Sequence, residues 1–431
     1  MRVASAPEAD VTGEVLVLVE ILINNNSNQP AARYLTWAWS PCRIRVTNPV
    51  GILGATAQVQ LSQTALPGGG AIRFSSTASG AGSATMNVTV PANGTSVPFF
   101  VRGITASTAD PGVRITARWK RLPIGPLTTV GNVDLMVRIR KSAVNLNTGE
   151  RNRLLSALAV LNNQGLGRFA DFRDMHVAAS NLEAHGRPGF LPWHRAYLLD
   201  LERELQAIDR SVALPYWRFD QPGPALFTPD FFGQGNNNNP VVLSPANPLL
   251  FWRTDGVTGI VRQPNFNVNS APPGVLTQAQ TLALGTAFAA FRTMEGNPHA
   301  QAHVSFSGFL QAISQAARDP LFFLLHCNVD RLWAAWQKAN NRYDVAVPAA
   351  FDTPVPPNPP NRIGHNLGDT MWPWNGVVTP PRPAVAPGGP LAASACVAAP
   401  GNTPRVRNCF DYQGSLATAN NLGFSYDDIP L

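Results

Sequence analysis

The sequence has few charged side chains, little cysteine and no long apolar run. Charged residues make up 14% of the 431 residues and apolar residues 45%, which argues against global disorder and allows a sizeable core. No apolar stretch reaches the ~18 residues of a transmembrane helix. Four cysteines without a CxxC pair are too few for a disulfide scaffold. Cys396 and Cys409 can pair across a loop, but free thiols are expected in a reducing cytosol.

The N-terminal segment MRVASAPEADVTGEV lacks the apolar run of a secretory signal. We therefore expect a cytoplasmic protein, and leave open export together with a partner. The net charge of +7 is uneven, because residues 1–140 carry 12 Lys+Arg against 6 Asp+Glu, and the rest carry 21 against 20. The arginines of the first part alternate with apolar residues and form no basic run. This favours a solvated strand face over a nucleic-acid or membrane surface.

Residues 13–140 alternate polar and apolar side chains, with Gly, Pro, Asn and Ser turns every dozen or so residues. Stretches such as Arg43–Val46, Gln58–Leu61, Met86–Val90 and Val113–Thr116 are typical of a sandwich or barrel. We predict an all-β first domain over 1–137. No histidine precedes position 176, so this domain offers no evident catalytic chemistry. Covering, docking or oligomerisation is its expected role.

A second domain, over 138–431, is predicted to be mainly α-helical. Asn147 or Thr148 can cap a helix, with Glu150 placed to return the hydrogen bond. Helical patterning also covers residues 191–208, 276–294, 299–316 and 319–340. The Pro-, Asn- and Gly-rich segments 221–275 and 345–405 are predicted to be long ordered loops. The fold class is therefore α+β multidomain: an all-β sandwich or barrel followed by an antiparallel helix bundle with long loops.

Six of the seven histidines fall into two sets of three. On a helix, His299 and His303 share a face, and His326 can complete their set. Imidazole suits copper, zinc, iron and nickel, and no carboxylate or cysteine is spaced to complete either set, so two trigonal metal sites are predicted. A zinc protease needs glutamate directly after the first histidine of HxxxH, where this chain has Ala300. The seventh histidine, His365, is interpreted as structural. The first set is His176, His185 and His194.

Three motifs carry a resemblance to a known family. FLPWHRAYLLDLE (190–202), NPHAQAH (297–303) and DPLFFLLHCNVDRLWAAW (319–336) resemble the paired copper motifs of the tyrosinase family of type-3 copper proteins, which includes catechol oxidases and molluscan haemocyanins. The likeness runs from near Arg140 through IGHNLGDTMWPWN (363–375) to LGFSYDD (422–428), and the predicted β domain lies outside it.

The resemblance implies two copper ions, one per histidine set, with O2 as co-substrate. Glu295 resembles an acidic residue that holds a water and helps to deprotonate a phenol. Ala300 stands where strong monophenolases often have asparagine, which argues against efficient tyrosine hydroxylation. Ile313, with Ala300 and Val304, is implied as a substrate gate. Glu183 occupies the position of a cysteine that many eukaryotic members link to the second ligand, so that crosslink is expected to be absent.

The residues around the last ligand have two interpretations. Asn328, Asp330 and Arg331 can fix imidazole tautomers, or form a salt bridge that ties helices together. Cys327 points about 100° away from its neighbour on a helix and is expected to fill the core. Core packing is likewise favoured over substrate contact for four aromatic residues: Phe190, Trp193, Phe322 and Phe323.

The predicted function is a dicopper oxidase that converts o-diphenols to o-quinones, with o-hydroxylation of monophenols left open. An oxygen-binding haemocyanin-like protein and an o-aminophenol oxidase are the alternatives. A third hypothesis makes the β domain the active part, and the complete histidine set argues against it. The expected partner is a small phenol, with no nucleic acid and no membrane. A homo-oligomer or a copper-loading chaperone is left open.

Overall fold

The computed structural model describes residues 16–21, 33–120, 126–162, 169–179, 184–254, 256–352, 364–372, 374 and 405–430. The chain folds into two compact units. The first consists mainly of Trp39–Val137, and the second contains Arg138–Leu431 together with Thr36–Ala38.

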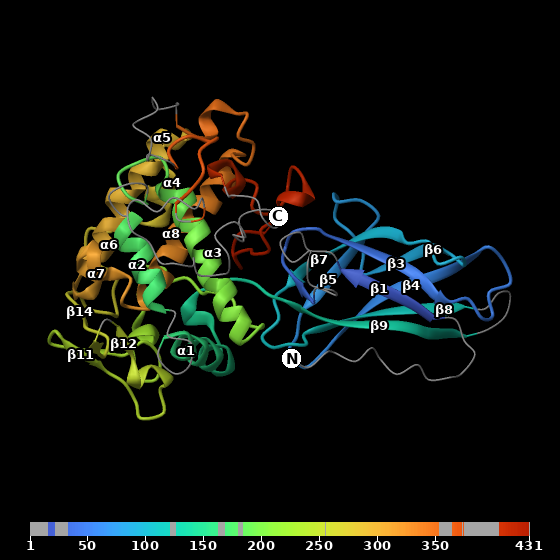
Figure 1. Ribbon diagram of the computed structural model, residues 1–431, viewed down its shortest axis with the longest axis horizontal. Coiled ribbons are helices and arrows are strands. Elements are labelled where there is room, and N and C mark those ends of the chain that lie inside the picture. Colours follow the sequence, from blue (N-terminus) through green and yellow to red (C-terminus); the bar gives the residue numbers. More distant parts are fainter. Residues whose placement is uncertain are drawn as a thin grey trace. The chain divides into compact units, whose positions relative to one another are not determined.

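The first unit is built from two β-sheets (Figure 1). One sheet has four antiparallel strands in the order β1 (Leu16–Ile21), β3 (Ser40–Asn48), β7 (Val97–Thr105) and β5 (Ala71–Ser75). The other has five strands in the order β2 (Tyr34–Leu35), β9 (Leu127–Val137), β8 (Val113–Lys120), β4 (Thr56–Ala65) and β6 (Thr85–Pro91). All its pairs are antiparallel except β2 with β9.

The alternating sequence pattern positions the core of this unit. In β3, Cys42, Ile44 and Val46 are buried, whereas Arg43 and Arg45 point to the opposite face. Residues of β1 contact β9, and residues of β5 contact β4, so side chains of the two sheets form one core. The predicted sheet-rich N-terminal region is therefore confirmed.

The second unit contains four long helices: α1 (Thr148–Asn162), α2 (Phe169–Ala179), α3 (Phe190–Ile208) and α8 (Leu321–Asn340). The predicted start of α1 is confirmed, because Asn147 Oδ1 accepts from Glu150 N at 2.9 Å and Glu150 Oε2 accepts from Asn147 N at 3.0 Å. Nearly every side chain of α3 and α8 is buried, and these two helices contact each other. No helix among the described residues is long and apolar enough to cross a membrane.

The prediction of two long helices over residues 276–294 and 299–316 is wrong. The chain there forms short pieces, in the order α4 (Gln278–Leu282), α5 (Phe288–Phe291), α6 (Gln301–Val304), β15 (Phe306–Gly308) and α7 (Ile313–Ala316). Gly285 and Gly308 adopt positive φ angles of 157° and 88°, which end regular helix. A Cβ on Gly308 would lie 2.3 Å from Val261 O, because β15 pairs closely with β14 (Arg262–Pro264). These breaks arise from tertiary pairing, which helical spacing cannot reveal.

The segment 221–275 is largely loop, as predicted, and it also forms small two-stranded pairs. They involve β10 (Gln234–Asn236), β11 (Asn239–Val242), β12 (Arg253–Thr254) and β13 (Val257–Thr258). Most of the predicted covering loop 345–405 lies outside the described residues, as do Glu183 and Cys396. The predictions made for those two residues therefore remain predictions.

Candidate metal centre

The first histidine set comes from two helices and the turn between them. His176 lies on α2, His194 on α3, and His185 in the segment that precedes α3. One ligand nitrogen from each ring lies within 4.8 Å of the other two. His176 and His194 are buried and His185 is half-buried.

The second set combines a helical turn, a short helix and α8. His299 lies in the π-helical turn Gly296–Ala300, His303 on α6 and His326 on α8. The Nε2 atom of His326 lies 3.3 Å from that of His299 and 3.2 Å from that of His303. Two nitrogens bound to one metal ion at about 2.0–2.1 Å in tetrahedral geometry are separated by about 3.3 Å. The three donors are therefore spaced as ligands of a single ion.

The two sets face each other. His194 stacks on His326, with ring centroids 4.3 Å apart and 14° between the ring planes. His185 and His299 are also nearly parallel, at 6.1 Å and 19°. Within each set the centroids are 4.8–5.7 Å apart. Six imidazoles thus form one cluster with two ion positions.

Backbone carbonyls orient three of these rings. The Nδ1 atoms of His194, His299 and His303 each lie 2.9 Å from a carbonyl oxygen, those of Phe190, Glu295 and Leu310 respectively. Donation from Nδ1–H leaves Nε2 as the lone-pair donor, and Nε2 of His194 has no hydrogen-bond partner in the described structure. An unsatisfied buried lone pair at a cluster of such donors fits a metal ligand.

Burial keeps the histidines neutral. It lowers the pKa of His176, His194, His299 and His326 well below the usual value, and neighbouring imidazoles lower it further. Burial also lowers the pKa of His303 to about 4. Neutral rings are the form that binds a metal, so the donor set is ready at neutral pH.

Aromatic side chains enclose the cluster. Phe322 packs against His176 and His326, with centroids 4.7 and 4.1 Å apart. Phe190 and Trp193 lie 4.8 and 5.0 Å from His194. All three are buried, and Phe323 packs behind Phe322 at 5.1 Å. These rings exclude water from one side of the cluster.

Glu295 is an acidic residue four positions before His299 of the second set. Its Oε1 accepts a 2.6 Å hydrogen bond from the backbone N–H of Gly186, the residue after His185. Burial raises the pKa of Glu295 to about 7, although Gly186 and Arg292 act to lower it. This carboxyl group can therefore exchange a proton near neutral pH.

The three residues named as a substrate gate are exposed. Ile313 and Val304 are 56% and 49% exposed, and Ala300 is also on the surface. The backbone of Ile313 hydrogen-bonds His176, which places the start of α7 beside the first histidine set. Val304 directly follows His303, and Ala300 directly follows His299.

Asn328, Asp330 and Arg331 contact polar groups other than imidazoles. Asp330 accepts hydrogen bonds from Arg195 at 2.6 Å, Arg140 at 3.3 Å and Tyr426 at 2.5 Å. Arg331 donates to Asn328 and Asp428. The tautomers of three histidines are instead set by carbonyl oxygens, so the contacts of these residues match the helix-tying interpretation.

Arg140 and Arg195, the arginines of this buried network, were not among the predicted site residues. Arg140 bonds Glu202 on α3 at 2.8 Å and Asp330 on α8 at 3.3 Å. Arg195 bonds Asp330, and its guanidinium lies 3.8 Å from the centre of the Trp333 ring. A usable signal was present, because Arg195 follows His194 directly and Asp330 lies one helical turn after His326. Cys327, predicted as a core filler, is fully buried with Sγ 3.4 Å from Leu214 O.

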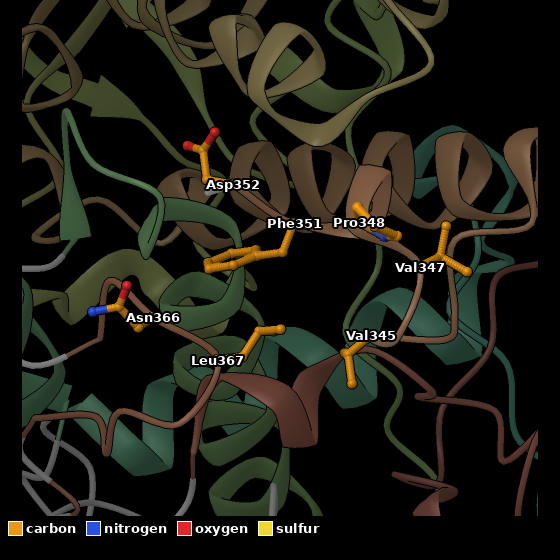
Figure 2. A pocket seen from close by; sticks show the side chains of 7 residues that line it. All are labelled: Val345, Val347, Pro348, Phe351, Asp352, Asn366 and Leu367. Carbon is orange, nitrogen blue, oxygen red and sulfur yellow. The ribbon is translucent and has the colours of Figure 1, made fainter. Parts of the chain in front are cut away.

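A separate cavity of about 230 Å³ lies between the chain after α8 and the segment around Leu367 (Figure 2). It is mainly apolar, and Asp352 at its edge bonds Arg292 at 2.5 Å. None of the six histidines lines it, so it is distinct from the metal cluster. Its lining is Val345, Val347, Pro348, Phe351, Asp352, Asn366 and Leu367.

The chain is similar in sequence to known tyrosinases. A family model described as "Common central domain of tyrosinase" matches residues 166–339. The tyrosinase of Streptomyces glaucescens is 33% identical over 266 residues, which cover 55% of this chain and 92% of that protein. The tyrosinase of Streptomyces antibioticus is 33% identical over 272 residues, covering 55% and 93%. A solved tyrosinase from Burkholderia thailandensis aligns with 68% of this chain and 74% of its own, at 18% identity and a TM-score of 0.45.

Proposed function

The chain belongs to the tyrosinase family, and from this premise we propose that it oxidises o-diphenols to o-quinones in preference to hydroxylating monophenols. It is a tyrosinase-type, type-3 copper protein and an oxidoreductase of the polyphenol oxidase kind. Its cofactor is a pair of copper ions and its co-substrate is O2. Family membership does not by itself establish the preference for diphenols, which is our proposal for this chain.

The histidine cluster carries this proposal. Six neutral imidazoles hold the two ions without adding charge, and the facing sets bring the ions to one substrate. When bound, the copper pair supplies the redox chemistry by which O2 oxidises a phenol. The polypeptide orients the rings through backbone carbonyls and keeps water away with Phe190, Trp193 and Phe322.

Glu295 is proposed as the proton acceptor for the substrate hydroxyl. A pKa of about 7 gives it both protonation states near neutral pH. The Gly186 N–H fixes one carboxyl oxygen next to His185, which leaves the other oxygen for a water or a phenol. This arrangement suits catechols, which lose a proton more readily than monophenols.

Ala300 supports the preference for diphenols. Its methyl group is exposed directly after His299 and offers no hydrogen-bonding group to a monophenol or its water. Val304 and Ile313 add exposed apolar surface beside the two histidine sets. We propose that these three residues contact the substrate ring without helping to deprotonate it.

The test is to load the full chain with copper, measure the stoichiometry, and compare O2 consumption with catechol, tyrosine and an o-aminophenol. We expect two coppers per chain, rapid oxidation of catechol and slow reaction of tyrosine. Tyrosine turnover as fast as catechol turnover would refute the preference. Reversible O2 binding without catechol oxidation would favour a haemocyanin-like carrier, and a faster aminophenol reaction would change the substrate class.

We also propose finer features of the fold. Contacts of α3 with α1 and α8 support an antiparallel bundle in the second unit. Domain limits of 1–137 and 138–431, a cytoplasmic location, and a homo-oligomer or copper-loading chaperone remain predictions.

A further inference from the structure

We propose that the outward face of the four-stranded sheet in the first unit binds the surface of an anionic lipid membrane. This face, called here the arginine face, carries arginines from three neighbouring strands. They are Arg43 and Arg45 on β3, Arg73 on β5 and Arg102 on β7. The inference is independent of the proposed oxidase activity.

Strand parity turns these side chains to one face, and the register places Arg73 beside Arg102, whereas Arg43 lies opposite Pro98, four residues from Arg102 along β7. Cys42, Ile44 and Val46 of β3 point into the core, so the arginines between them point outward. The same alternation turns Arg73 and Arg102 outward, because Ile72, Phe74, Phe99 and Val101 are buried. Arg73 and Arg102 are direct cross-strand partners, and β3 pairs with β7 on its other side.

The charges of three of the four arginines on this face, all except Arg43, are poorly compensated. No ion pair with an acidic residue joins Arg45, Arg73 or Arg102 within the described part of the chain. Arg102 donates to Ala81 O at 3.4 Å and its guanidinium lies 4.9 Å from the centre of the Trp39 ring. Glu20 is opposite Arg43 in the strand register. Like charges in direct cross-strand contact destabilise a sheet, so the Arg73–Arg102 pair points to an anionic ligand.

The five-stranded sheet provides a contrast in the same unit. There Arg114 pairs with Asp134 at 2.6 Å, in direct cross-strand register. Gln58 donates to Thr89 at 2.8 Å on the same outward side. Arg114 therefore lies opposite an acidic partner, whereas the residue directly opposite Arg73 is another arginine, Arg102.

Apolar residues on the same side favour a lipid surface over nucleic acid. Leu16 and Leu18 of β1 are 37% and 38% exposed, and Ile104 of β7 is 39% exposed. Leu18 lies directly opposite Arg45. Arginines that reach phosphate groups, beside apolar side chains that enter the headgroup region, suit an anionic bilayer. Single-stranded nucleic acid would need exposed aromatic platforms, and the outward aromatic residue here, Phe100, is only half-exposed opposite Pro41.

This proposal revises an expectation from the sequence. Alternation of arginine with apolar residues argued for a solvated strand face and against a membrane partner. In the sheet, the same alternation places all four arginines on one side. The missing information was the strand order, which joins β5, β7 and β3 across more than fifty residues of sequence.

The test uses the full chain in co-sedimentation with vesicles. Phosphatidylcholine vesicles are compared with vesicles that also contain phosphatidylserine, at low and high salt. We expect binding only to the anionic vesicles, weakened by salt. The double variant Arg73→Gln/Arg102→Gln should lower the partition coefficient by about 25-fold, at about fivefold per arginine near an anionic surface. The matched control Arg114→Gln/Arg118→Gln removes the same charge from the five-stranded sheet. It should change the partition coefficient less than twofold.

Four results would overturn the proposal. Equal loss of binding in both double variants would show a net-charge effect. Equal binding to neutral and anionic vesicles, or no binding to anionic vesicles, would exclude recognition of anionic headgroups. Tighter binding to an oligonucleotide than to vesicles would assign the face to nucleic acid. Unchanged catechol oxidation and circular dichroism in both variants establish that each is folded. A further variant, Leu16→Ser/Leu18→Ser, should lower binding at high salt, where the apolar contribution dominates.

Discussion

The rings of His194 and His326 stack at 4.3 Å although they belong to different histidine sets. His194 lies on α3 and His326 on α8, so contact between these two helices fixes the separation of the sets. The adjacent residue Arg195 and the residue one turn onward, Asp330, join the same helices through a 2.6 Å ion pair. The distance between the two metal positions thus depends on a buried ion pair, Arg195 with Asp330, that contacts neither position.

We expect Asp330→Asn to destabilise the second unit by about 3–5 kcal/mol, because it leaves the buried Arg195 and Arg140 without a full counter-charge. Copper should also be lost at lower chelator concentration. Denaturant unfolding followed by tryptophan fluorescence, and chelator titration, measure the two effects. Asp134→Asn, which breaks a partly exposed pair in the first unit, serves as control and should change little. An Asp330→Asn protein as stable as wild type would show that the Asp330 ion pairs do not hold α3 and α8 together.

We expect His194→Ala to lose both bound copper and catechol oxidation, because one trigonal site is left with two donors and the facing set loses its stacked partner. The circular dichroism of the β-sheet unit should persist. Copper content by atomic absorption is the measurement. His365→Gln, a change at the one histidine outside both sets, should keep two coppers. Two coppers in His194→Ala would contradict the ligand assignment.

Much of the metal cluster could be predicted because its signal is local. The spacing of His299 and His303, the cap at Asn147 and the apolar periodicity of α3 and α8 each depend on neighbours within a few residues. The alternation that defines the strands is local in the same way.

The remaining features depend on contacts between distant segments. The breaks near Gly285 and Gly308 follow from packing and from the pairing of β15 with β14. The carbonyl of Leu310 orients His303 only because the chain turns back after α6. The contacts of Arg140 with α3 and α8, and the strand order that joins the arginine face, have no short-range pattern, since each depends on residues from several elements.

We expect Ala300→Asn to raise the ratio of monophenol to diphenol kcat/KM by about tenfold. The added carboxamide would supply a hydrogen bond beside His299, and one such bond to a charged group contributes about 1.5–3 kcal/mol. The position is exposed and helical, so the side chain can be accommodated. Ala300→Val adds bulk without a polar group and should not raise the ratio. An increase in both variants would point to shape rather than hydrogen bonding.

We expect Glu295→Gln to reduce kcat for catechol by about 100-fold, a typical loss when a general base is removed. The amide oxygen can still accept from the Gly186 N–H, so the local fold and copper content should be retained. Steady-state kinetics and copper analysis on the same sample distinguish the effects. Loss of copper together with activity would make Glu295 a structural residue, and full activity would remove it from the mechanism.

The buried pair of Arg140 and Glu202 gives an acid dependence of stability with a defined sign. Burial acts to raise the pKa of Glu202, but the Arg140 guanidinium and the Leu214 N–H hold that pKa below its usual value of 4.5. A carboxyl with a depressed folded-state pKa contributes stability that is fully present above the unfolded value and is lost as pH falls through the folded value. Wild-type unfolding free energy should therefore decline below pH 4.5, and Glu202→Gln should be less stable at neutral pH with a shallower decline. Urea unfolding at a series of pH values measures both slopes, and parallel slopes would show that Glu202 does not account for the acid sensitivity.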